Sequence, residues 1–132
     1  MPAAPASVNR QPTSAETGLR LDEPVRFQWD TYAQSGGAGA LSEVEVVIYE
    51  TTGVTVLWRS GLRVPEAGVC GDGWFEVYPR YLASGKAVLT SGLAVKWCVR
   101  QRDAGGVSAE STKTAFTMET ANVTATVWET GQ

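Results

Sequence analysis

The chain has 132 residues, of which 43% are hydrophobic and 19% are charged, and it contains five Trp, four Tyr and three Phe. This length fits one domain, and the composition excludes wholesale disorder because it supplies large apolar side chains for a core. The net charge of −3, without a run of Lys or Arg, argues against a nucleic-acid partner. No apolar stretch approaches the length that crosses a membrane, and the first residues lack a signal-peptide pattern, so we expect no membrane partner.

The first 20 residues are rich in Ala, Pro, Ser and Thr. Pro2, Pro5 and Pro12 disfavour helix and central-strand pairing throughout this segment. We therefore predict an extended arm over residues 1–20 that contributes one edge strand at about residues 6–9.

From residue 21 onward, apolar and polar residues alternate with a period of two, which is typical of half-buried strands. In "VRFQW" the inward residues are Val25, Phe27 and Trp29. In "SEVEVVIYE" the inward residues are Val44, Val46 and Ile48, and the outward ones are Glu43, Glu45 and Val47. Glycine-rich loops and turns separate these and the later segments. The pattern predicts an all-β domain of seven to eight short strands, a sandwich or a barrel.

Cys98 lies in "LAVKWCVRQR", where Lys96 and Arg100 flank it at a distance of two residues. The alternation places Val95, Trp97 and Val99 inward, and Lys96, Cys98 and Arg100 outward. We therefore expect Cys98 on a solvent or partner face, where the nearby cations would lower its pKa. A disulfide with Cys70 is weighed against two unpaired thiols, and the outward position of Cys98 argues against the disulfide.

Lys96, Arg100 and Arg102 form a basic row on the outward side of this segment, and the resemblance in fold described below implies that the strand carrying Glu43 and Glu45 pairs beside it. Cross-strand ion pairing is favoured over a binding surface for this row.

The sequence contains no histidine, so no Cys-His or Ser-His nucleophile pair can form. The carboxylates are scattered among turns and outward strand positions, which is typical of solvated surface charge. Two distant cysteines lack zinc spacing, and "GDG" at 71–73 is too short to indicate a calcium loop. We expect no enzyme activity, no cofactor and no metal.

The order of several short motifs resembles a fibronectin type III-like, or immunoglobulin-like, sandwich of the kind found in bacterial and phage proteins. The matching stretches are "PVRFQW", "LSEVEVVIYETTGVTVLWRSG", "WFEVYPRYLASG" and "LAVKWCVRQRDAGGVSAESTKTAFTM". The resemblance implies an antiparallel β-sandwich over residues 21–118, followed by a C-terminal extension at 119–132 that could form an extra strand. Val95 and Cys98 depart from the family pattern, since a Tyr and an Arg are usual at these positions.

The resemblance implies a non-enzymatic structural or adhesion module of a phage virion, either a minor tail component or a capsid decoration protein. Its partners would be other virion proteins, further copies of itself and a host-surface glycan. We expect the arm and the last strand to dock on neighbouring subunits, and the loops at 34–40, 66–74 and 103–107 to face outward. The candidate docking residues in the last strand are Val123, Val127 and Trp128, because an uncovered Val/Thr-rich strand invites strand addition.

The alternative function is a carbohydrate- or surface-binding accessory module located at the bacterial cell surface or outside the cell. In that hypothesis the exposed aromatic residues Trp74 and Tyr78 serve as stacking platforms for a sugar.

Overall fold

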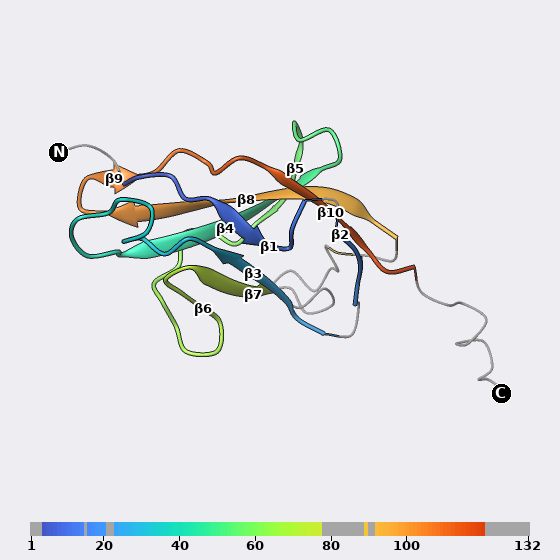
Figure 1. The fold of residues 1–132 in the computed structure, drawn as a ribbon, viewed down its shortest axis with the longest axis horizontal. Helices are drawn as coiled ribbons and strands as arrows, with labels where there is room; N and C mark the ends of the chain where they lie inside the picture. Colours follow the sequence, from blue (N-terminus) through green and yellow to red (C-terminus); the bar gives the residue numbers. More distant parts are fainter. Residues whose placement is uncertain (1–3, 15, 21–22, 78–88, 90–91, 121–132) are drawn as a thin grey trace.

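The computed structural model describes residues 4–14, 16–20, 23–77, 89 and 92–120 (Figure 1). These residues form ten strands and no helix, which confirms the predicted all-β fold. The strands are β1 (Asn9–Gln11), β2 (Glu16–Leu19), β3 (Val25–Trp29), β4 (Glu43–Glu50), β5 (Val56–Arg59), β6 (Cys70–Gly71), β7 (Trp74–Val77), β8 (Ala94–Asp103), β9 (Gly106–Val107) and β10 (Thr114–Met118). Ten is more than the seven to eight expected, because β6 and β9 have only two residues each, too few for an alternating pattern to reveal.

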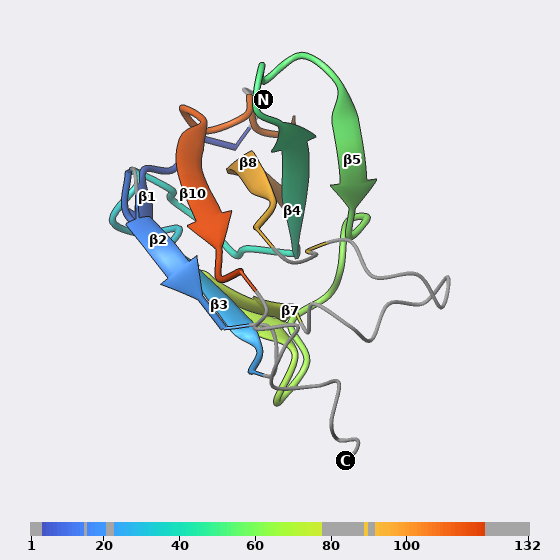
Figure 2. The ribbon, with the colours of Figure 1, turned by 90° about the vertical axis from the view of Figure 1, so that its right-hand side faces the viewer.

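The strands form two sheets that face each other (Figure 2). The smaller sheet has the order β1-β3-β7-β6, and the larger sheet has the order β2-β10-β8-β4-β5, with β9 paired to β8. Neighbouring strands run antiparallel except for β2 and β10, which run parallel. The two layers give the described part of the chain the form of a β-sandwich.

The core lies between the two sheets and is built from the alternating residues of the longer strands. Strand β8 contributes Val95, Trp97 and Val99, all at most 1% exposed. The rings of Phe27 on β3 and Trp97 on β8 lie with their centroids 4.9 Å apart and tilted by 59°, a favourable aromatic arrangement across the two layers. The inward positions predicted for β3, β4 and β8 are therefore confirmed.

The N-terminal segment bridges both sheets. Strand β1 pairs with β3 in the smaller sheet, and β2 pairs with β10 in the larger sheet. The side chain of Asn9 donates hydrogen bonds from Nδ2 to the carbonyls of Trp97 and Thr112 at 3.0 and 2.9 Å. Further along, Trp97 Nε1 donates to the carbonyl of Pro12 at 3.2 Å. The edge strand thus begins at Asn9, at the end of the predicted range 6–9, and the segment contributes a second strand, β2.

Candidate functional site

Five residues were predicted to bind a partner, and the structure describes one of them. Tyr78, Val123, Val127 and Trp128 lie outside the described residues. Trp74, the fifth, begins β7 and is partly buried.

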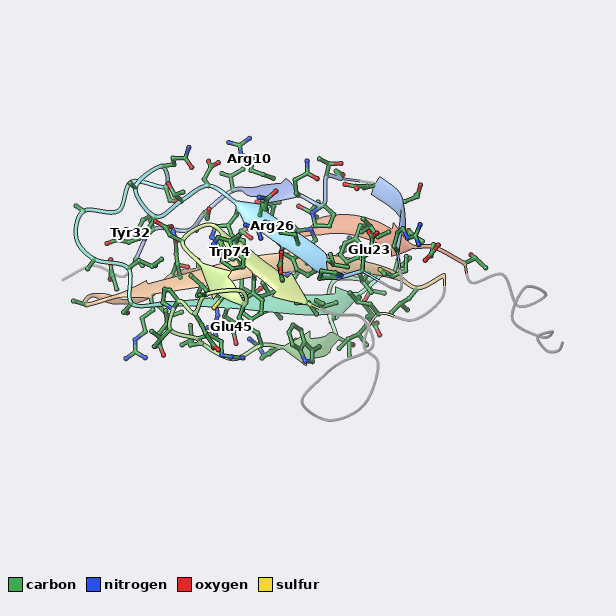
Figure 3. The ribbon with its side chains drawn as sticks, turned by 90° about the horizontal axis from the view of Figure 1, so that it is seen from below. Arg10, Glu23, Arg26, Tyr32, Glu45 and Trp74 are labelled. Atoms are coloured by element: carbon green, nitrogen blue, oxygen red, sulfur yellow. The ribbon has the colours of Figure 1, made fainter. Side chains whose placement is uncertain are left out.

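Trp74 lies on the outer face of the smaller sheet, beside Arg26 of β3 (Figure 3). The guanidinium carbon of Arg26 lies 4.3 Å from the ring centroid, which is a cation–π contact. Arg26 also pairs with Glu76 at 2.8 Å, so its position over the ring is held from a second side. The indole Nε1 lies so close to Gly71 that a Cβ there would approach it to 2.5 Å. The protein itself therefore occupies part of the ring surface that a sugar would stack on.

The outer face of the larger sheet carries the predicted cross-strand ion pairs. Glu43 faces Arg102 and Glu45 faces Arg100 in the register of β4 and β8. Arg100 Nε donates to Glu45 Oε1 at 2.8 Å, and Arg102 Nη1 donates to Glu43 Oε1 at 2.9 Å. The prediction of pairing between these strands is confirmed for both arginines.

Glu45 was predicted to be an outward, solvated residue, but its side chain is only 3% exposed (Figure 3). Arg59 of β5 lies 3.6 Å from the same carboxylate oxygen, so two guanidinium groups flank it. Burial of this carboxylate is tolerated because both cations compensate its lost hydration.

Cys98 is also buried, which makes the predicted exposure wrong. It points away from the main core as the alternation required, but Val47 and Tyr49 of β4 pack with it in a second, smaller buried cluster. Burial, followed by the charge of Glu110, raises the pKa of Cys98 to about 12. The predicted lowering of the pKa is therefore wrong, because desolvation of the thiolate outweighs the nearby cations. A thiol with this pKa is not a nucleophile near neutral pH.

Cys70 is buried in the main core between the sheets, and both cysteines are free. The Cys70 Sγ contacts the carbonyl of Val64 at 3.6 Å, and burial raises its pKa. Cys70 on β6 of the smaller sheet faces the core between the sheets, whereas Cys98 on β8 of the larger sheet belongs to the other cluster, outside that core.

Three loops meet at one end of the sandwich. Tyr32, in the loop between β3 and β4, donates its backbone N–H to Asp72 at 2.7 Å and its hydroxyl to Asp103 at 2.7 Å. Asp72 lies in the turn between β6 and β7, where Gly73 has a φ of +88° and a Cβ would meet the Trp29 carbonyl at 3.0 Å. The "GDG" stretch is therefore a tight turn whose carboxylate caps a neighbouring loop.

A cavity of about 150 Å³ opens beside this contact, lined by Tyr32, Ala38, Gly39, Ala40, Asp103 and Ala104. Its polar groups already have protein partners, because the second Asp103 oxygen accepts a hydrogen bond from the Gly105 N–H at 2.7 Å. The cavity is small, and the carboxylate oxygens of Asp103 that line it already accept hydrogen bonds that join the loops.

The most exposed apolar surface of a strand lies on β5, at the edge of the larger sheet (Figure 2). Val54 in the preceding turn is 79% exposed, Val56 is 36% exposed and Leu57 is 42% exposed. The sequence could not show that the strand in this segment ends a sheet, because strand order depends on the whole topology. Among the described strands, none pairs with the outer side of β5, so the structure shows an apolar edge that the sequence did not reveal.

In the part of the chain that the structure describes, no group of three or more His, Cys, Asp or Glu could hold a metal ion. No helix there is long and apolar enough to span a membrane. Comparison of the sequence with protein-family models and with curated proteins finds no match.

Proposed function

We propose that this protein is a non-enzymatic structural module of a phage virion, a minor tail component or capsid decoration protein that binds neighbouring virion subunits. The observation that carries the proposal is the exposed apolar edge at β5, with Val54, Val56 and Leu57 uncovered. An apolar strand edge that offers free backbone groups is a template for pairing with another chain.

The strand order supports the immunoglobulin-like form of the sandwich that the sequence resembles. Immunoglobulin-like sandwiches place strands A, B, E and D in one sheet and C, F and G in the other. When β2, β5 and β9 are set aside and the other strands are lettered in sequence order, β1-β3-β7-β6 corresponds to A-B-E-D and β10-β8-β4 corresponds to G-F-C. In this lettering β5 takes the position of an additional strand beside C, and β2 that of an additional strand beside G. The phage assignment follows from the resemblance in sequence.

The chemistry of the described side chains supports a binding role rather than a catalytic one. The buried carboxylate of Glu45 is held by Arg100, and the buried Cys98 has a pKa of about 12. Trp74 supports the carbohydrate-binding alternative less well, since Arg26 covers part of its ring.

The proposal is tested on particles produced from the genome that encodes the chain. We expect immunogold labelling to locate the protein on the particle and quantitative mass spectrometry to give a fixed copy number. Hundreds of copies would identify a decoration protein, and a handful would identify a tail component. Particles that lack the protein would contradict the proposal. Glycan binding that is lost on Trp74→Ala would instead favour the alternative.

A further inference from the structure

The edge of β5 has the features of an acceptor for an added strand. Its inner side pairs with β4 through Val47, Ile48 and Tyr49, and no other described strand pairs with its outer side. The edge contains neither proline nor lysine between Val54 and Trp58, residues that commonly protect such an edge. Within the described part of the chain, its apolar side chains therefore stand beside backbone groups that no strand pairs.

A donor segment for such an edge follows β10 in the sequence. The backbone of Glu119 is still held by the sandwich, since its N–H donates to Leu19 at 2.8 Å and its carbonyl accepts from Gly92 at 2.9 Å. The sequence then reads "NVTATVW" from 122 to 128, outside the described residues. Val123, Ala125 and Val127 alternate with polar residues, and β-branched residues predominate, as in a strand.

The register shows where this donor segment starts relative to the acceptor edge. Thr117 pairs with Ala94, Glu50 pairs with Val95, and Tyr49 pairs with Val56. The end of β10 and the start of β5 therefore lie at the same end of the larger sheet, with β8 and β4 between them.

This placement disfavours pairing of the segment with β5 of its own chain. In the larger sheet β8 and β4 lie between β10 and β5, so β10 and β5 are three strand spacings apart. Three spacings amount to about 14 Å. An extended chain crosses that span in about four residues, and one further spacing brings it to the free edge. Crossing would therefore use the first half of the segment, and only its last few residues could pair with β5.

We infer that residues 122–128 of one copy add as a strand to the β5 edge of a second copy. This inference rests on the proposed structural role and deepens it, because it names a second copy of the chain as the partner. The donor and acceptor are different surfaces, so the contact is head-to-tail and repeats from copy to copy into a ring or a filament.

The test measures self-association of the full chain by analytical ultracentrifugation over a range of protein concentrations. We expect reversible, concentration-dependent oligomers. Leu57→Lys places a charge on the acceptor edge and should weaken the association by about tenfold or more. Val8→Lys is the matched control, since Val8 is 53% exposed and precedes β1 of the smaller sheet, and it should associate as the wild type does. Circular dichroism verifies that each variant is folded.

A second measurement keeps the inference falsifiable if a variant misfolds. A synthetic peptide of residues 121–130 in excess should dissociate the oligomers of the unaltered chain, whereas a scrambled peptide should not. A chain that stays monomeric, or oligomers that neither Leu57→Lys nor the peptide weakens, would overturn strand donation to β5. The copy number in particles is an independent readout, so a module that enters virions as a monomer would refute this inference and leave the proposed function standing.

Discussion

At the scale of single residues, Cys98 shows that a side chain on the outward side of a strand can still be buried. The alternation in β8 places Cys98 on the opposite side from Trp97, and the two belong to different buried clusters. The thiol is covered because Tyr49 packs beside it and donates its hydroxyl to Glu110 at 2.6 Å. Lys113 lies 4.4 Å from the Tyr49 ring centroid on the same surface. The outer face of this sheet therefore has its own small buried cluster.

Burial of this cluster predicts a loss of stability at alkaline pH. The pKa of Cys98 rises from 9.0 to about 12 through burial, and that of Tyr49 rises from 10.0 to about 12 through its hydrogen bond to Glu110. Between pH 9 and pH 12 the unfolded thiol loses its proton while the folded thiol keeps it. The folded state then binds more protons, so its stability falls as pH rises.

Urea denaturation between these pH values checks the prediction. Cys98→Ser removes the titrating thiol and should flatten the decline, while Tyr49 still contributes part of it above pH 10. An equal slope of unfolding free energy against pH in the variant and the wild type would show that Cys98 does not titrate in this way. Thiol labelling gives a second check, because native Cys98 should react only after unfolding.

At the scale of elements, the N-terminal segment closes the side of the sandwich between β3 and β10. Asn9 is central to this contact. Its Nδ2 also lies 2.8 Å from Thr114 Oγ1, so its two hydrogens are shared among three acceptors, and its Oδ1 accepts from Ser111 Oγ at 2.5 Å. A single side chain on β1 of one sheet thus ties down the chain leading into β10 of the other.

Asn9→Ala should lower the free energy of unfolding by about 2–3 kcal/mol, because it removes several hydrogen bonds and leaves their partners unsatisfied. The neighbouring Arg10→Ala is a matched control, since it removes only an exposed ion pair with Asp30 and should unfold close to the wild type. Urea denaturation followed by tryptophan fluorescence measures both. If the two variants unfold at the same urea concentration, Asn9 does not join the sheets energetically.

The sequence was sufficient to predict the strands that are long enough to show an alternation of apolar and polar residues. Strands β3, β4 and β8 have at least five residues each, and their inward sets are those predicted. The pairing of β2 with β10 was not predictable, because its residues Glu16–Leu19 have no alternating apolar pattern and are ordered by the strand beside them. The candidate site depended still more on tertiary contacts. The guanidinium over Trp74 and the edge position of β5 both arise from strand order, which local sequence does not encode.

At the scale of the whole molecule, the two ends of the sandwich differ in the contacts that their loops and turns make. At one end, the loop between β3 and β4 is joined to the β6–β7 turn by Asp72 and to the end of β8 by Asp103. At the other end, the β4–β5 turn presents the 79% exposed Val54, and the register places the end of β10 at this same end of the larger sheet. The first end is held together by polar contacts within the chain, and the second presents the apolar edge that we infer to receive a second copy.

The contact between Tyr32 and Asp103 predicts that the loop end is sensitive to acid. The hydrogen bond from Tyr32 lowers the pKa of Asp103 below 3.8, and the N–H of Gly105 acts in the same direction. A carboxyl group with a lowered pKa stabilises the folded state above its unfolded pKa, and this contribution is lost as pH falls through the folded value. Tyr32→Phe keeps the ring in place but removes the hydroxyl donor. The variant should therefore unfold at a lower urea concentration than the wild type at neutral pH, and the difference should shrink as the pH falls below 3.8.

Hydrogen exchange of residues 33–40 gives a second measurement. It should increase in the variant at neutral pH, because the loop then loses one of its two anchors. A difference in urea midpoint that stays constant down to low pH would show that Tyr32 acts through packing alone, independently of the charge on Asp103.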